Sequence, residues 1–241
     1  NSVSKERQTM LFSATMPQEI MKIATTYMQL PIRIEITRPG SSTKNIEQEV
    51  FVIRANQKNR LLEAVLNQYK GSVLVFSRTK HGAKRISNAV KHFGFTSTDI
   101  HSNKSLSQRR EALEGFKRGK YRVLVATDIA ARGLDIDQLP HVVNFELPNV
   151  PEDYVHRIGR TGRAGNEGEA VSLVCVDELG LLRDIERVLK REIPKVTVAG
   201  FEPNPAIKAE PITRGRGQRG NPAAPHGRPC EREGRAKGVM D

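Results

Sequence analysis

The chain of 241 residues is 37% hydrophobic and carries a formal net charge of +12 at pH 7, which favours a polyanionic partner such as nucleic acid. Its two cysteines, Cys175 and Cys230, lie too far apart for a C-x-x-C zinc motif or a disulfide framework. The sequence also has neither an apolar run of membrane-spanning length nor a signal-peptide pattern. We therefore expect a cytoplasmic protein with no metal site of its own and no membrane partner.

Short β-branched runs alternate with helical patterns over residues 8–197, which is typical of a parallel α/β sheet flanked by helices. In chain order, the predicted strands are residues 9–13, 32–36, 49–53, 72–76, 97–100, 122–126, 141–145 and 169–174. The predicted helices between them are residues 17–30, 57–69, 79–93, 107–118, 152–158 and 178–192.

Two changes in composition divide the chain. Residues 38–44 contain Pro, Gly and Ser but no apolar side chain, which is typical of a linker. We therefore predict that residues 1–37 complete one domain and that residues 45–200 form a second one. Residues 201–241 contain many Gly and Pro residues and a single aromatic residue, Phe201, so they cannot bury enough apolar surface to offset chain entropy. We predict that this tail is disordered, and we expect the chain, which opens on Asn1, to be part of a longer protein.

Polar residues follow two of the predicted strands. Ser77, Arg78 and Thr79 come after VLVF, and Thr127 and Asp128 come after VLVA. Ligands of open parallel sheets bind at the carboxyl ends of the strands, so these loops predict a surface for a polyanion. The alternative is that the two threonines only cap the helices that follow them.

The densest group of cationic side chains is HRIGRTGR, residues 156–163. Arg160 lies four residues after His156, so a helical turn would place both on one face. Gly159 and Gly162 would let the backbone approach a bulky ligand closely. Arginine suits the stabilisation of a transferring phosphoryl group, because its donors are planar and its charge is permanent. A solvated basic face is the alternative, although such a face gains nothing from interleaved glycines.

The same segment resembles motif VI of the DEAD-box RNA helicases. ATDIAARGLDI, residues 126–136, resembles their motif V, VFSRTK, residues 75–80, resembles motif IV, and SAT, residues 13–15, resembles motif III. The resemblance implies an ATP-dependent RNA helicase to which this chain contributes the second RecA-like domain. The segment LPNVPEDYVHRIGRTGRAG and the Arg-Gly tail are most similar to the bacterial RhlE-like subgroup.

The resemblance also assigns roles to individual residues. Arg160 and Arg163 match the arginine fingers that contact the γ-phosphate of ATP, and Asp135 matches the aspartate that reaches the ribose. His156 matches the histidine that links to motif III and to the catalytic carboxylates across the cleft. Three further residues match positions that couple the ATP state to the RNA state: Ser13, Thr15 and Arg132.

Three positions match family residues that hold the RNA sugar-phosphate backbone: Thr79, Arg109 and Thr127. The family often has Gln-x-x-Arg at the start of the helix that carries Arg109, but here Leu106 stands at the glutamine position. Gln108 is the nearby residue that could substitute for this glutamine.

The phosphate-binding sequence G-x-x-x-x-G-K-[ST] and the sequence Asp-Glu-Ala-Asp appear nowhere in the chain. The resemblance therefore implies that ATP with Mg²⁺ is held mainly by a missing N-terminal RecA-like domain, and that this chain alone is inactive. RNA is the implied partner, and ribosome-assembly or RNA-decay proteins are candidate protein partners. The alternatives are a non-catalytic RNA-binding module from a truncated helicase and a DNA-directed helicase of the same superfamily.

The basic tail generates a first prediction. Residues 201–241 carry a small excess of Lys and Arg over acidic residues, and Arg214, Arg216 and Arg219 form a cluster without acidic neighbours. Each phosphate of single-stranded RNA that is neutralised contributes about −0.7 to the log–log salt slope. If roughly three arginines engage, deletion of the tail should make the slope shallower by about 2. A salt titration of RNA binding tests this, and an unchanged affinity and slope would make the tail an inert solubilising segment.

Overall fold

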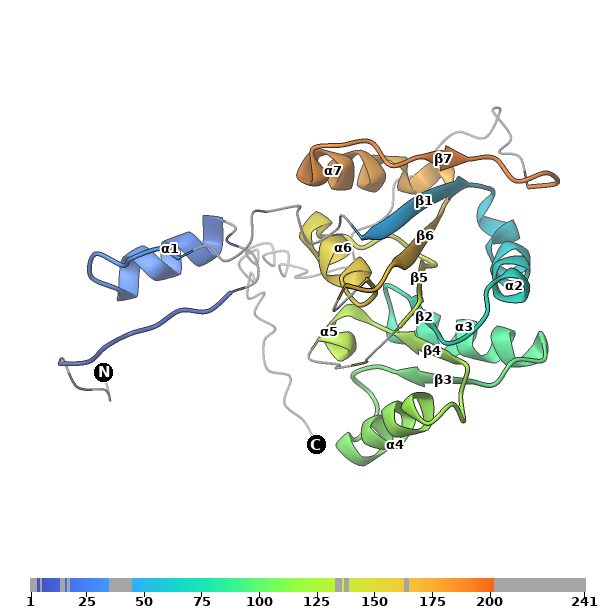
Figure 1. Cartoon of the computed structure of the whole chain (residues 1–241), viewed down its shortest axis with the longest axis horizontal. Coiled ribbons are helices and arrows are strands. Elements are labelled where there is room, and N and C mark those ends of the chain that lie inside the picture. Colours follow the sequence, from blue (N-terminus) through green and yellow to red (C-terminus); the bar gives the residue numbers. More distant parts are fainter. Residues whose placement is uncertain are drawn as a thin grey trace, which may run out of the picture.

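The computed structural model describes residues 4, 6–13, 16, 18–34, 45–132, 136, 139–162 and 165–201. A parallel sheet forms the centre of the part after residue 45 (Figure 1). Its strands are β1 (Ile46–Val52), β2 (Val73–Phe76), β3 (Ser97–Ile100), β4 (Val123–Ala126), β5 (His141–Asn144), β6 (Gly168–Val174) and β7 (Lys195–Val196). They pair in the order β3-β4-β2-β5-β6-β1-β7, and every pairing is parallel. The predicted parallel α/β sheet is confirmed.

Helices flank the sheet and connect its strands. The α-helices are α1 (Gln18–Tyr27), α2 (Lys58–Gln68), α3 (Lys80–His92), α4 (Leu106–Lys117), α5 (Asp128–Ala131), α6 (Pro151–Ile158) and α7 (Leu179–Leu189), and the 3₁₀ turns are η2 (Ala55–Gln57) and η3 (Val176–Glu178). Each predicted helix is confirmed with small shifts at its ends. The short α5 and β7 were not predicted, because four and two residues are too few to show a period.

Side chains that alternate along each strand divide the core into two layers. Val73 and Val75 of β2 pack with apolar residues of α2 and α3, whereas Leu74 and Phe76 pack with residues of α4, α5, α6 and α7. Because both faces are covered, the central strands are apolar along their whole length, as a parallel sheet requires.

The register of the sheet brings two predicted loops together. Phe76 at the end of β2 pairs with Ala126 at the end of β4, so the loops that follow these strands start side by side. β2 and β5 are neighbours, and the connections that leave them diverge, since β2 leads through α3 to β3 at one end of the sheet and β5 leads through α6 to β6 on the other side. Such a switch point forms the crevice in which open α/β sheets bind ligands.

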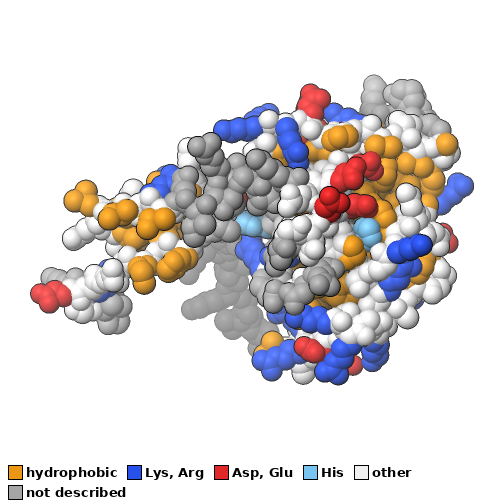
Figure 2. Space-filling view, in the orientation of Figure 1, with side chains coloured by type: hydrophobic (Ala, Val, Ile, Leu, Met, Phe, Trp, Pro, Cys, Tyr) orange, Lys and Arg blue, Asp and Glu red, His pale blue; other side chains and the backbone are white. Residues whose placement is uncertain are grey.

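Two predicted strands are wrong within the part of the chain that the structure describes. Residues 9–13 and 32–34 are not in strands, and residues 35 and 36 lie outside the described residues. Neither segment has a neighbouring strand there to complete a hydrogen-bonded ladder. Their apolar side chains are exposed, including Phe12, Ile32 and Ile34. Figure 2 shows hydrophobic side chains in orange on the surface of the part of the chain around α1.

Several domain predictions fall on residues that the structure leaves undescribed. The predicted linker, residues 38–44, and nearly all of the predicted tail, residues 202–241, belong to this group, so the domain boundaries and the disorder of the tail stay predictions. Among the described helices, none combines the length and the apolar composition needed to cross a membrane.

Leu124 in the middle of β4 allows a test of the two-layer core. Its side chain is fully buried, so Leu124→Ala should lower the free energy of unfolding by about 2–5 kcal/mol, because transfer energy and cavity cost add. The matched control is Leu106→Ala, since Leu106 is 63% exposed and should lose less than about 0.5 kcal/mol. Urea unfolding followed by circular dichroism measures both, and equal losses would contradict the observed core.

Candidate functional site

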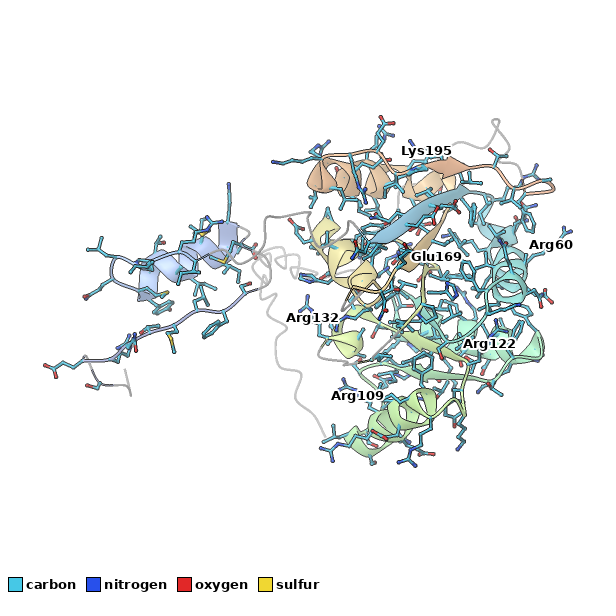
Figure 3. All side chains as sticks on the ribbon, in the orientation of Figure 1. Arg60, Arg109, Arg122, Arg132, Glu169 and Lys195 are labelled. Carbon is cyan, nitrogen blue, oxygen red and sulfur yellow. The ribbon has the colours of Figure 1, made fainter. Side chains whose placement is uncertain are left out.

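The three predicted RNA-binding residues come from neighbouring segments at the carboxyl edge of the sheet. Thr79 follows β2 and precedes α3, and Thr127 follows β4 and precedes α5. Arg109 reaches from α4 to α5, where its Nη2 donates to the carbonyl of Ala130 at 3.4 Å. Figure 3 shows Arg109 and Arg132 on one side of the domain and Arg60 and Arg122 on the other. Lys and Arg side chains also gather around α4 in Figure 2.

The two threonines differ in what their side chains do. Thr79 caps α3, since its Oγ1 accepts the N–H of Gly82 at 2.9 Å. A hydroxyl that accepts still has its own hydrogen to donate, so Thr79 can also contact a phosphate. Thr127 makes no side-chain cap hydrogen bond. The capping interpretation therefore holds for Thr79 and is wrong for Thr127.

Gln108 uses its side-chain oxygen at the start of its own helix. Its side-chain Oε1 accepts the N–H of Ser105 at 3.0 Å, and its own N–H donates to the hydroxyl of Ser105. This capping box satisfies the first turn of α4 and commits the Gln108 side chain to the helix start. Leu106, at the family's glutamine position, is exposed, and the side-chain NH₂ group of Gln108 keeps its donors.

His156 and Arg160 do not share a helix, contrary to our prediction. α6 ends at Ile158, and Arg160 follows in a tight turn in which its N–H donates to the carbonyl of Arg157 at 3.1 Å. Glycine favours such an end, because a longer helix would have to order the backbone of Gly159, which costs more conformational entropy than ordering any other residue. Both His156 and Arg160 are half-buried near this end.

Gly162 serves packing rather than ligand approach. Its φ is +65°, and a Cβ atom there would lie 2.7 Å from Cγ1 of Ile46. The close contact between this turn and β1 therefore requires glycine, which corrects the ligand-based explanation. Thr161 next to it is buried, and its hydroxyl donates to the carbonyl of Leu139.

The structure describes two of the three predicted coupling residues, Ser13 and Arg132. Arg132 follows α5, and its Nη2 lies 3.1 Å from Oδ1 of Asp153 in the first turn of α6, so an ion pair joins motif V to the helix that leads into motif VI. Ser13 is exposed. Three predicted site residues lie outside the described residues: Thr15, Asp135 and Arg163.

Arg157, the arginine inside HRIGRTGR that had no predicted role, is 1% exposed. Its Nε and Nη2 both donate to the carboxylate of Asp128, the Nη2 to Oδ2 at 2.8 Å. Its Nη1 donates to the carbonyl of Glu146 at 2.6 Å and to Oδ1 of Asn144 at 3.2 Å, and its guanidinium lies over the ring of Phe76. Arg157 therefore joins β2, β5, α5 and α6 rather than a ligand.

Arg78 is also turned inward, which corrects part of the predicted polyanion surface. Its Nη2 donates to Oε1 of Glu178 at 2.8 Å, and its backbone N–H donates to Oε2 of Glu146 at 2.8 Å. With Asp128 paired to Arg157, both charges of the two strand-end loops are satisfied inside the protein. The hydroxyls of Thr79 and Thr127 remain for a ligand. The sequence analysis missed Glu146 and Glu178; the pattern that could have indicated them is an acidic residue shortly after an apolar strand.

Burial raises two pKa values near the site. Burial is the main reason that the pKa of Tyr154 on α6 rises to about 12, and its hydroxyl donates to Oε1 of Gln48. Burial and then the neighbouring Glu178 carboxylate raise the pKa of the Cys175 thiol. Both groups therefore stay neutral at physiological pH.

Other features of the described residues lie apart from this edge. A hollow of about 380 Å³ beside the start of α7 is lined by Asn149, Arg183 and Arg187 among others, and no predicted site residue lines it. Within the described ranges, no group of three or more His, Cys, Asp or Glu residues could hold a metal ion.

Known proteins match this arrangement. The helicase conserved C-terminal domain model matches residues 56–165. The DEAD-box protein SrmB of E. coli, solved bound to regulator of ribonuclease activity A, is 32% identical to this chain, with a TM-score of 0.63. That match covers 69% of this chain and 98% of the SrmB chain. The chain belongs to the DEAD-box ATP-dependent RNA helicase family.

Two more relatives define how much of such a helicase the chain contains. ATP-dependent RNA helicase DbpA of Bacillus subtilis is 45% identical over 198 residues, which cover 82% of this chain and 41% of DbpA. Dbp5 of S. cerevisiae, bound to RNA and ADP BeF3, is 28% identical with a TM-score of 0.74, and the match covers 81% of this chain and 52% of Dbp5. The chain thus spans less than half of the DbpA relative, and it carries the RecA-like helicase C-terminal domain.

Arg157 allows a test of the inward ion pairs. Arg157→Met should lower the free energy of unfolding by about 3–5 kcal/mol, because it leaves the Asp128 carboxylate partly buried without its partner. The control is Arg187→Met, which removes a 79% exposed arginine paired with Asp184 and should change stability by less than about 1 kcal/mol. Urea unfolding compares them, and equal stability of the two variants would show that the buried guanidinium is dispensable.

Proposed function

We propose that this chain is the second motor domain of an ATP-dependent RNA helicase that remodels or locally unwinds RNA duplexes. The observation that carries the proposal is the carboxyl edge of the sheet, where Thr79 and Thr127 follow two paired strands and Arg109 reaches to α5; α6 carries His156, and Arg160 follows it. The relative Dbp5, bound to RNA and ADP BeF3, supports both the RNA and the nucleotide parts.

RNA would lie along the loops after β2 and β4. Hydroxyls and a guanidinium suit the sugar-phosphate backbone, which carries charge and acceptors at every nucleotide but no sequence information. Contacts of this kind bind RNA without regard to sequence. A short RNA duplex would lose base pairs when two closing domains bend the bound strand.

Arg160 would supply positive charge to the γ-phosphate, together with Arg163, while Asp135 would contact the ribose. The half-buried Arg160 at the end of α6 fits this task, because a preorganised cation stabilises the charge that develops during phosphoryl transfer. ATP would supply the phosphoryl group that is hydrolysed, and the protein ligands of its Mg²⁺ ion would belong to the first domain. His156, Ser13, Thr15 and Arg132 would link the ATP state to the RNA state.

The proposal has three finer parts. We infer an RhlE-like subgroup from the segment around HRIGRTGR and from the Arg-Gly tail. Proteins of RNA decay or ribosome assembly are proposed partners, and the complex of SrmB with regulator of ribonuclease activity A supports the first class. A cytoplasmic location is proposed from the isolated cysteines.

Reconstitution tests the proposal. The chain alone should not hydrolyse ATP with saturating RNA, because it lacks the phosphate cradle, whereas addition of the separate first domain should produce RNA-stimulated phosphate release. Arg160→Ala should lower the reconstituted rate by on the order of 10³-fold and leave RNA affinity nearly unchanged.

The control is Arg118→Ala, which removes an 80% exposed arginine at the end of α4 and should leave the rate unchanged. Turnover by the chain alone would refute the two-domain assignment. RNA binding without any turnover in the reconstituted pair would favour the alternative, a non-catalytic RNA-binding module. Loss of RNA affinity but not of hydrolysis in Arg160→Ala would make Arg160 an RNA contact.

A further inference from the structure

Two carboxylates from distant parts of the chain hold the loop that ends at Thr79. Glu146 accepts the N–H of Arg78 at 2.8 Å and the hydroxyl of Ser77 at 3.0 Å. Glu178 accepts Nη2 of Arg78 at 2.8 Å. The backbone and the side chain of Arg78 are thus fixed separately, one residue before Thr79.

Glu178 is 1% exposed and has a full set of donors. Its Oε1 accepts Arg78 and the N–H of Leu147 at 3.2 Å, and its Oε2 accepts Nζ of Lys58 and the N–H of Cys175 at 3.2 Å. Burial of a carboxylate is costly unless good geometry and further hydrogen bonds compensate, and here two cations and two amides do so. The donors come from α2, the loop after β2, the segment after β5 and the turn after β6.

We propose that Glu178 is a positioning residue for RNA binding, which holds Arg78 and thereby fixes residues 77–79 in the conformation that presents Thr79 to the RNA backbone. The proposal rests on the proposed function and deepens its RNA contact. The side chain of Arg78 is 17% exposed and faces Glu178, so Arg78 is an anchor of the loop and not a phosphate ligand. Glu178 lies outside every motif that the sequence singled out.

Electrostatics and positioning predict opposite effects when Glu178 loses its charge. Removal of a negative charge strengthens the attraction between a protein and a polyanion. Release of Arg78 weakens binding instead, because residues 77–79 would then have to be ordered each time RNA binds. The sign of the change in RNA affinity therefore separates the two effects.

The experiment measures binding of fluorescein-labelled decauridylate to the whole chain by fluorescence anisotropy, at a temperature where circular dichroism shows each variant folded. Glu178→Gln should weaken binding by about tenfold, the cost of ordering one or two side chains on binding. In combination with Thr79→Ala it should add little to the loss from Thr79→Ala alone, because both changes act on one contact. The matched control is Glu186→Gln, whose carboxylate on α7 bonds Ile193 and Lys195 away from this loop and which should not weaken binding.

Arg78→Met provides a second variant in case Glu178→Gln does not fold. It removes the anchor but leaves Glu178 paired with Lys58, and it should weaken binding about as much as Glu178→Gln with an unchanged salt slope. A slope shallower by about 0.7 would make Arg78 a direct phosphate contact and overturn the proposal. Equal or stronger binding by the folded Glu178→Gln variant, while Thr79→Ala weakens it, would also overturn the proposal and leave the proposed function intact. No binding by the unmodified chain, or no effect of Thr79→Ala, would refute the RNA contact at Thr79 and this inference with it.

Discussion

The pairing of Arg157 with Asp128 is the interaction on which the arrangement of the sheet edge depends. A guanidinium that is 1% exposed needs a partner for each of its donors, and Arg157 finds them in Asp128, Asn144 and the carbonyl of Glu146. Asp128 follows β4, Asn144 ends β5 and Glu146 follows β5, so these bonds tie the position of α6 to both strands. The turn that carries Arg160 begins directly after α6 and therefore inherits this position.

Buried charges are also paired in the loop after β2. Arg78 and Lys58 share Glu178, while Glu146 binds the backbone of Arg78, so that cations and carboxylates beneath the edge compensate one another. A buried network of this kind constrains direction as well as distance, which an apolar contact does not. The hydroxyls of Thr79 and Thr127 and the guanidinium of Arg109 stay at this edge, a combination suited to the RNA backbone.

Membership in the DEAD-box family explains why the edge resembles half of a site. In the proposed function the nucleotide would be held by a separate domain, and this domain would contribute the arginines after α6 and the RNA contacts after β2 and β4. Thr79, Thr127 and Arg160 each lie within three residues of the end of a strand or helix. The capping box orders the start of α4, and Gly162 lets the turn after α6 pack on Ile46.

The sequence by itself determined the alternation of strands and helices after residue 45, the order of the motifs and the edge at which the loops after β2 and β4 meet. These features depend on local periodicity and on the rule that parallel strands end at one edge. Residues 9–13 and 32–34 show the limit of that reading, since an apolar run forms a strand only beside another strand. Only the tertiary structure decided which charged residues face inward. Arg78 and Glu178 are 100 positions apart, and no local pattern reports whether a distant carboxylate will meet an arginine or leave it to a ligand.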